Sequence, residues 1–299
     1  MTEIIEKGTA KRMQRRCWSI FLSLVISLSL VTPVLAVDCQ AIKKGIQAEK
    51  NLAKRRVLVA DAILQCPDDP VLNYKYGLSL ERFRKYDKAL EYYQKAVLLD
   101  PKMGKAYAGM GDIYIYLGLV DESIKAYQQA VELIPADDRF AGKLARLQIK
   151  KKALEGEVLT SGEFIRVMDN RGKISANTPL LLSGPALQYR IAFVVNSDVL
   201  LAKGISQIAA VGKAMQNDAI KHVRFEISTH VDTSDSSLDA MEESKKRAEM
   251  IKEQLVTNFQ IDPKRLEIRW HGDSQAIETD KFGEDWPLNQ RVEFRRINE

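Results

Sequence analysis

One pattern of glycine, small and aromatic residues recurs after 34 positions in the first half of this 299-residue chain. The first copy reads Asn73, Tyr76, Gly77, Leu80, Ala89, Tyr93, Ala96 and Pro101, and the second reads Tyr107, Met110, Gly111, Tyr114, Ser123, Tyr127, Ala130 and Pro135. A fixed period of this length is typical of stacked helical hairpins, each of which buries its apolar face only against its neighbours. The sequence therefore predicts a solenoid of helix pairs, in which each proline ends a pair.

The period and the order of small and large residues resemble the tetratricopeptide repeat (TPR). Gly77 and Gly111 are expected to let the two helices of a repeat approach closely, while Tyr93 and Tyr127 fill the space between layers.

The expected helical region extends beyond the two clear copies, because two hairpins alone would leave apolar ends exposed. Its parts are a degenerate first hairpin at 38–67, the best repeats at 70–103 and 104–137, and a capping helix at 139–155, all within a TPR domain at 37–155.

TPR arrays are binding scaffolds, so the resemblance implies a groove for a protein partner. The matching positions are Tyr74, Leu78, Glu81 and Arg82 in one repeat and Lys105, Ala108, Asp112, Ile115 and Tyr116 in the next. This mixture of aromatic, apolar and charged side chains suits a peptide or a partner helix, and ordinary surface is the alternative.

The N-terminus has the pattern of an export signal. A basic stretch precedes an apolar run from Trp18 to Thr32, and Ala36 offers a small residue for cleavage. We expect a signal peptide at 1–36, with Met13 as a second candidate start. An uncleaved anchor is the alternative, because the run approaches the ~20 residues that span a bilayer.

Export places Cys39 and Cys66 in an oxidising compartment as an even pair. They lie at the start of the first helix and the end of the second helix of the degenerate hairpin. Antiparallel helices bring those ends together, so we expect a disulfide, with two separate buried thiols as the alternative. Asp38 disfavours lipid attachment at Cys39.

The apolar period changes to alternation in the second half of the chain. Alternation at 189–195, 223–227, 266–270 and 292–294 predicts four strands, and helical patterns at about 198–216 and 237–259 separate the first three. The β-α-β-α-β-β order predicts helices layered on a mixed sheet at 187–299. A linker and lead-in at 156–186, with a capping-box pattern before a short helix, connects it to the repeats.

Three motifs in this second half resemble the OmpA-like domain. They are Thr229-His-Val-Asp232, Ser244-Lys-Lys-Arg247-Ala248 and Asn289-Gln-Arg291-Val-Glu293, and Asn196-Ser197 also matches the family's entry loop. The separation of 15 residues between Asp232 and Arg247 is the most specific feature. The chain is thus predicted to be multi-domain, an all-α TPR solenoid followed by an α/β (α+β) OmpA-like sandwich.

The OmpA-like resemblance implies binding of peptidoglycan through the diaminopimelate of its stem peptide. That group carries an ammonium and a carboxylate on one carbon. Asp232 would accept hydrogen bonds from the ammonium, and Arg247 would donate to the carboxylate. Asn196 and Arg291 are the other expected contacts.

Several positions depart from the family pattern, namely Val231, Asp235, Ala240, Glu243 and Gln290. Val231 and Ala240 remove side-chain contacts to the ligand, and the acidic residues would repel a carboxylate. Two alternatives therefore stay open. Asp232 and Arg247 form a structural ion pair, or the domain no longer binds peptidoglycan.

The sequence shows no nucleophile with a base, phosphate loop, zinc spacing or cofactor motif, so neither catalysis nor a metal nor a cofactor is expected. After residue 36 the chain carries 40 Lys/Arg and 38 Asp/Glu, which gives no indication of a nucleic-acid partner. The predicted function is a periplasmic adaptor, associated with the cell wall or outer membrane. It would bind peptidoglycan and an unidentified periplasmic or outer-membrane protein. The alternatives are a scaffold with a degenerate OmpA-like domain and a cell-wall enzyme with an unrecognised site.

Overall fold

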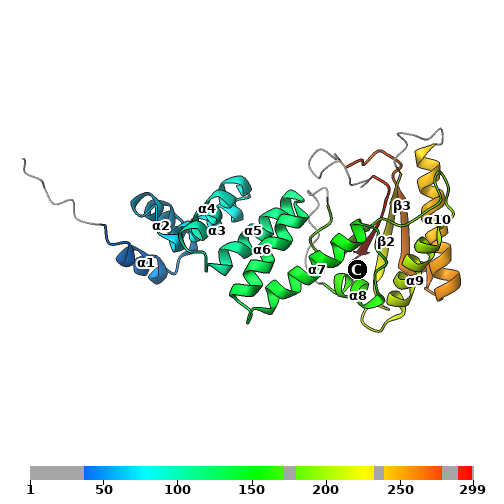
Figure 1. Ribbon diagram of the computed structural model, residues 1–299, viewed down its shortest axis with the longest axis horizontal. Helices are drawn as coiled ribbons and strands as arrows, with labels where there is room; N and C mark the ends of the chain where they lie inside the picture. The colour runs from blue at the N-terminus through cyan, green and yellow to red at the C-terminus, as the bar shows by residue number, and fades with distance from the viewer. Residues whose placement is uncertain (1–36, 171–179, 232–238, 278–288, 298–299) are drawn as a thin grey trace, which may run out of the picture. The chain divides into compact units, whose positions relative to one another are not determined.

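Residues 37–170, 180–231, 239–277 and 289–297 are described by the computed structural model (Figure 1). The predicted signal peptide at 1–36 and the predicted ligand residue Asp232 lie outside these ranges. The chain divides into two compact units, Met1–Asp38 and Cys39–Glu299. Within the described ranges, no helix combines the length and the apolar character needed to cross a bilayer.

Three helical hairpins and a longer helix form the first part of the second unit. Their helices are α1 (Cys39–Ala48), α2 (Leu52–Gln65), α3 (Pro70–Arg82), α4 (Tyr86–Leu99), α5 (Gly104–Leu117), α6 (Val120–Leu133) and α7 (Asp138–Leu154). Local signals set the helix starts. The Asp69 carboxylate accepts a hydrogen bond from Leu72 N at 3.0 Å, and Pro70 occupies the first turn of α3, where no backbone N–H is needed. The predicted solenoid of helix pairs is confirmed.

The repeat tyrosines occupy space that glycines leave open. A Cβ added at Gly77 would lie 2.9 Å from the Tyr93 ring, and one added at Gly111 would lie 2.7 Å from the Tyr127 ring. Gly109, which the period does not mark, is as close to Tyr93, at 2.6 Å. Both rings are fully buried. The close helix approach predicted at Gly77 and Gly111 is confirmed.

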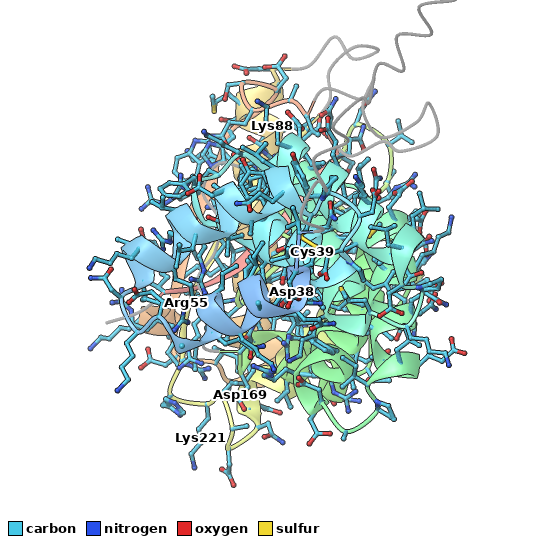
Figure 2. All side chains as sticks on the ribbon, turned by 90° about the vertical axis from the view of Figure 1, so that its left-hand side faces the viewer. Asp38, Cys39, Arg55, Lys88, Asp169 and Lys221 are labelled. Carbon is cyan, nitrogen blue, oxygen red and sulfur yellow. A yellow bond between two sulfur atoms is a disulfide. The ribbon has the colours of Figure 1, made fainter. Side chains whose placement is uncertain are left out.

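Cys39 and Cys66 form the predicted disulfide, with their Cα atoms 6.0 Å apart. α1 begins at Cys39, which Figure 2 labels, and α2 ends next to Cys66, so the bond fastens the two ends of the first hairpin. Cys66 also packs in a buried cluster with Ile46 and Leu72, which joins this hairpin to α3.

A four-stranded mixed sheet forms the second part. Its strands are β1 (Ala186–Tyr189), β2 (Arg224–His230), β3 (Leu266–Trp270) and β4 (Arg291–Ile297), and its helices are α8 (Ser161–Met168), α9 (Ala202–Gln216) and α10 (Ala240–Phe259), with a 3-10 turn at Pro263–Arg265. The strand order is β1-β4-β2-β3, with β4 antiparallel to β1 and β2, and with β2 parallel to β3. The predicted mixed sheet covered by helices is confirmed.

The first predicted strand, at 189–195, is wrong in its position, because β1 ends at Tyr189. Arg190 N donates to Ala153 O of α7 at 3.1 Å, and Ala192 N donates to the Gln207 side chain of α9 at 3.0 Å. The alternation follows burial only as far as Ile191, since Val195 is 84% exposed. These two backbone N–H groups therefore bond to helices, and further along Phe193 forms only an isolated bridge with Leu200.

The predicted helix at 198–216 is correct in type but begins later, at Ala202. Leu201 lies just before this helix and Ile205 lies in its first turn, and they are 48% and 57% exposed.

Helix α7 belongs to two hydrophobic clusters. Leu147 and Leu154 pack with Tyr127 in the cluster of the helical repeats. Ile149 and Ala153 pack with the residues of the sheet and its helices. The repeats and the sheet therefore share one helix.

The lead-in to β1 is fastened to α7 by a buried amine. Lys150 Nζ donates to Leu181 O at 2.6 Å, to Gly184 O at 3.0 Å and to Ser183 O at 3.4 Å. Leu182 and its neighbour Leu180 are buried in the same cluster as Leu147. The end of the predicted linker is thus held by packing and by hydrogen bonds.

Replacing Gly109 by alanine should destabilise the repeats by about 1–3 kcal/mol, because the added Cβ overlaps the buried Tyr93 ring. Gly45 on α1 is the matched control, since nothing lies within 4 Å of its added Cβ. Gly45→Ala should leave the protein unchanged or slightly more stable, as alanine favours the helix. Urea unfolding followed by circular dichroism measures both, and equal effects would contradict the packing described above.

Replacing Lys150 by methionine should destabilise the protein by about 2–4 kcal/mol, because buried carbonyl groups of the lead-in lose their donor. The neighbouring Lys151→Met is the control. It removes only partly exposed ion pairs with Asp121 and Glu155 and should cost less than about 1 kcal/mol. Thermal unfolding of both variants decides whether the amine holds the lead-in.

Candidate functional site

The loop after β1 forms a fixed turn next to α10. Val194 N donates to Val199 O at 2.8 Å, which closes the turn. Asn196 at its tip has a φ of 54°, in the left-handed region that asparagine tolerates better than most residues. The turn presents the Ser197 carbonyl to α10, where Arg247 Nε donates to it at 3.1 Å.

Helix α10 is positioned by hydrogen bonds at the carboxyl end of β2. The Thr229 hydroxyl donates to Ser244 O at 2.6 Å, and the Ser244 hydroxyl accepts from Gly272 N at 2.9 Å. Asp239 caps the helix by accepting from Met241 N at 2.9 Å. Residues of the predicted motifs therefore hold the helix that carries Arg247.

Arg247 is almost fully buried, with 4% exposure, and already has an anionic partner. Its Nη2 donates to Glu243, four residues earlier on α10, and its guanidinium lies 4.5 Å from the centre of the Phe193 ring. Burial lowers the pKa of Arg247, and the Glu243 charge opposes this shift. Its Nη1 makes no hydrogen bond to any residue that the structure describes.

The Glu243 pair was missed as a contact by sequence reasoning, which treated Glu243 only as a departure from the family. Its four-residue spacing from Arg247 on a helix was the available signal. The pair bears on the alternative that Asp232 and Arg247 form a structural ion pair. Arg247 does form a structural ion pair, with Glu243, and Asp232 lies outside the described residues.

Arg247 and Arg291 line one small cavity. The other lining residues are Ile191, Phe193, Thr229, His230, Gln290 and Val292. The free space is about 10 Å³, close to that of one water molecule. Two of the predicted ligand residues thus come together, and Asn196 lies in the turn that Arg247 holds.

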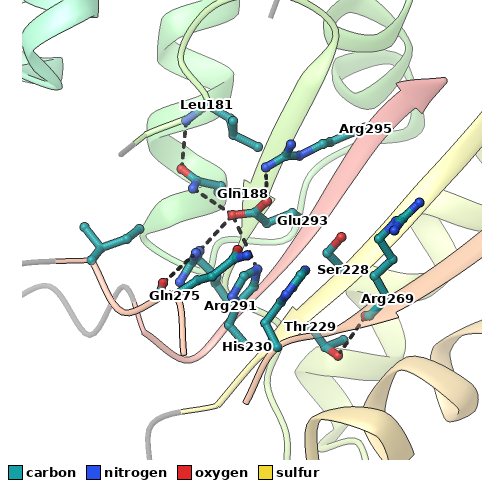
Figure 3. A network of polar contacts seen from close by, with 12 residues as sticks. Leu181, Gln188, Ser228, Thr229, His230, Arg269, Gln275, Arg291, Glu293 and Arg295 are labelled. Carbon is teal, nitrogen blue, oxygen red and sulfur yellow. Dashed lines mark hydrogen bonds and ion pairs between the residues drawn. The ribbon is translucent and has the colours of Figure 1, made fainter. Parts of the chain in front are cut away.

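A buried carboxylate neutralises Arg291 (Figure 3). Glu293 accepts from Arg291 Nε at 2.9 Å, from Gln188 Nε2 at 3.1 Å and from Arg295 Nη2 at 2.7 Å. Burial opposes the ionisation of Glu293, but the two arginines and the Gln188 hydrogen bond outweigh it and lower the pKa to about 2. Arg291 also donates to Gln275 O at 3.2 Å, so its main contacts are internal.

His230 is buried beside this network. Its ring stacks on His271 with centroids 4.8 Å apart, and neither ring nitrogen has a hydrogen-bond partner among the described residues. Burial, together with the charge of Arg291, lowers the pKa of His230 to about 3, so the ring is neutral. In the part of the chain that the structure describes, no three His, Cys, Asp or Glu side chains group as metal ligands would.

The predicted TPR-groove residues line two hollows. The first hollow, of about 350 Å³, includes Tyr74, Leu78 and Arg82. The second hollow, of about 470 Å³, includes Glu81, Asp112, Ile115 and Tyr116. Lys105 is exposed on α5 and lines neither hollow, and Ala108 is buried.

The carboxylates of the second hollow are engaged within the array. The Tyr93 hydroxyl donates to Glu81 at 2.5 Å, and the Tyr127 hydroxyl donates to Asp112 at 2.6 Å. Lys143 Nζ also donates to Asp112, at 2.5 Å. Burial raises the pKa of Glu81. These acids satisfy buried hydroxyl groups before any partner binds.

Comparison with protein families matches residues 82–147 to the tetratricopeptide repeat and residues 192–290 to the OmpA family. The chain therefore contains a TPR region followed by an OmpA-like domain, and both predicted resemblances are confirmed. Both are typically non-catalytic binding modules, and the second indicates a protein of the cell envelope.

Individual relatives match parts of the chain. Small glutamine-rich tetratricopeptide repeat-containing protein 2 of Mycosarcoma maydis is 31% identical over 79 residues, which cover 26% of this chain and 22% of that protein. The chain spans less than a quarter of the length of the curated relatives it matches.

Two solved structures are similar to stretches of this chain. The first TPR of Spaghetti (RPAP3) bound to the HSP90 peptide SRMEEVD has a TM-score of 0.35 at 22% identity, covering 38% of this chain and 95% of that one. The periplasmic domain of Helicobacter pylori MotB has a TM-score of 0.33 at 18% identity, covering 38% and 82%.

The Glu293 network makes stability depend on acid. Because its pKa is lowered in the folded state, ionised Glu293 stabilises the fold above about pH 4.5, and this contribution is lost as the pH falls toward 2. Glu293→Gln should reduce the change of the free energy of unfolding with pH in this range. At pH 7 it should cost about 3–5 kcal/mol, because the buried Arg291 loses the carboxylate that neutralises it.

Glu267→Gln is the control for this prediction, since Glu267 pairs with the half-exposed Arg269 at the surface and should contribute less than about 1 kcal/mol. Denaturant unfolding between pH 2 and pH 7 measures all three proteins. A Glu293→Gln curve parallel to that of the wild type would show that the network does not govern acid sensitivity.

Proposed function

We propose that the protein is a non-enzymatic adaptor of the cell envelope. Its OmpA-like domain binds peptidoglycan, and its TPR region binds a protein partner. The observation that carries the proposal is the shared cavity of Arg247 and Arg291, which lies inside the region that matches the OmpA family. The cavity itself holds about one water molecule, so a carboxylate of the ligand would bind at its mouth, next to Arg247.

The ligand group proposed here is the diaminopimelate of the peptidoglycan stem peptide. Its carboxylate would accept a hydrogen bond from Arg247, whose Nη1 makes none to the described residues. Its ammonium would be bound by Asp232, two residues after the end of β2. The Asn196 turn fixes the Arg247 side chain, and Arg291 lines the same cavity, where it is paired with Glu293.

Glu243 makes this binding weaker than two free guanidinium groups would give. The ligand carboxylate must share Arg247 with a carboxylate that is already in place on the same helix. We therefore expect modest affinity, and we expect the affinity to rise when Glu243 loses its charge.

We propose further that residues 1–36 direct export to the periplasm, where the protein is associated with the cell wall or outer membrane. The Cys39–Cys66 disulfide supports this location, because disulfides persist in oxidising compartments. The partner of the TPR region would be another periplasmic or outer-membrane protein.

Co-sedimentation of the whole mature chain with purified peptidoglycan tests the proposal. Asp232→Asn should weaken binding about 10- to 100-fold, since it removes a charge-assisted hydrogen bond. Glu243→Gln should strengthen binding. Lys246→Gln, an exposed charge one residue before Arg247, is the control and should change it less than about twofold.

Arg247→Lys is preferred to alanine at this position, because Arg247 also holds the Ser197 turn and its loss could unfold the loop. Equal sedimentation of the wild type and Asp232→Asn would remove the wall-binding role. The second candidate, a protein-interaction scaffold with a degenerate OmpA-like domain, would then take its place. The Glu243–Arg247 pair is the observation that favours that candidate.

A further inference from the structure

The first hollow of the TPR region is lined by four cations and no carboxylate. Its charged lining residues are Arg55 and Arg56 of α2 and Lys75 and Arg82 of α3. Figure 2 labels Arg55, which belongs to the N-terminal hairpin of the array. The hollow lies between the first and second hairpins, so its cations come from two different repeats.

None of these four cations forms an ion pair with a carboxylate in the part of the chain that the structure describes. Arg55 donates to the backbone oxygen of Glu49, and Arg56 lies over the Phe83 ring at 5.2 Å. Arg56 Nε is buried and lacks a hydrogen-bond partner among the described residues. Burial and the nearby charge of Arg55 lower the pKa of Lys75, so the cations destabilise one another.

The hollow also has an apolar lining. Ile46, Leu52, Val59, Tyr74 and Leu78 contribute to it, and Leu52 is 57% exposed. Phe83, beside Arg56, is 58% exposed. A ligand that fits must therefore combine negative charge with apolar side chains.

The second hollow differs in this respect, although it belongs to the same array. Its carboxylates, Glu81 and Asp112, accept hydrogen bonds from tyrosines, and Lys143 is paired with Asp112. Arg146 and Lys150 also line the second hollow without an ion pair among the described residues, but that hollow carries two carboxylates and the first hollow carries none. Its free space of about 350 Å³ holds a few side chains and suits an extended or helical segment.

We infer that the first hollow binds an acidic segment of the protein partner, with carboxylates on Arg55, Arg56, Lys75 and Arg82 and with apolar side chains against Leu52 and Leu78. The inference rests on the proposed partner-binding role of the TPR region and specifies the chemistry of that partner. Anionic lipid is the competing source of negative charge. A hollow between two hairpins favours a peptide, because a membrane surface needs a protruding face.

A display library of random short peptides, selected on the whole mature chain, tests this inference without assuming a partner. The wild type should enrich peptides that combine Asp or Glu with Leu, Ile or Phe. The double variant Arg55→Glu/Arg56→Glu should lose this enrichment. Lys88→Glu is the control. It reverses the charge of an exposed residue of α4 that lies apart from Arg55 in Figure 2, and this variant should keep the enrichment.

The most enriched peptide is then measured by fluorescence anisotropy. Each replaced arginine should weaken binding by about tenfold or more, so the double variant should bind the peptide at least about 100-fold more weakly. Lys88→Glu should change binding by less than about twofold. Added salt should weaken wild-type binding. Circular dichroism of the double variant checks that it remains folded.

Three outcomes would overturn the inference. They are enrichment of peptides without acidic residues, equal binding by the double variant, and binding only to vesicles that contain phosphatidylglycerol. Sedimentation of the double variant with peptidoglycan separates this result from the proposed function. If the double variant still sediments with peptidoglycan and the wild type enriches neutral peptides, the proposed adaptor function stands. Only the preference for acidic peptides is then removed.

Discussion

Helix α7 is packed into two hydrophobic cores at once, and the connection between the two binding modules depends on it. One face places Leu147 against the last TPR hairpin, and the other places Ile149 against the sheet. Between them Lys150 binds the lead-in to β1 through three carbonyl groups. Apolar burial on both faces stabilises the helix far more than its own hydrogen bonds would. A C-terminal fragment that begins after α7 would therefore lack part of the hydrophobic core of the sheet.

Charge is distributed differently in the two candidate binding surfaces. In the OmpA-like domain each arginine of the cavity is paired with a glutamate, Arg247 with Glu243 and Arg291 with Glu293. A ligand carboxylate must compete with those pairs, which reduces the net gain from binding. In the first TPR hollow the cations have no such partners, as Arg56 shows. The same kind of side chain thus has a structural role at one surface and is available to a ligand at the other.

Features set by a repeated or local pattern could be predicted from the sequence. The Gly77–Tyr93 contact follows from the 34-residue period, and the disulfide follows from cysteines at the two ends of one hairpin. The strand at 189–195 could not be placed correctly, because the alternation of apolar residues does not show where the backbone hydrogen bonds go. The partner of Arg190 N is Ala153, on a helix that sequence patterns assign to another domain.

The shared helix also has a mechanical consequence. A flexible linker behaves as an entropic spring, so a pull on one domain first extends the linker before it reaches the other. Helix α7 is hydrogen-bonded along its length and both of its faces are packed in a hydrophobic core, so it extends little under load. With a protein partner and peptidoglycan bound as proposed, tension on the partner would pass to the OmpA-like domain through a stiff element. The proposed adaptor would then keep its partner at a set distance from the wall, which a flexible linker would not do.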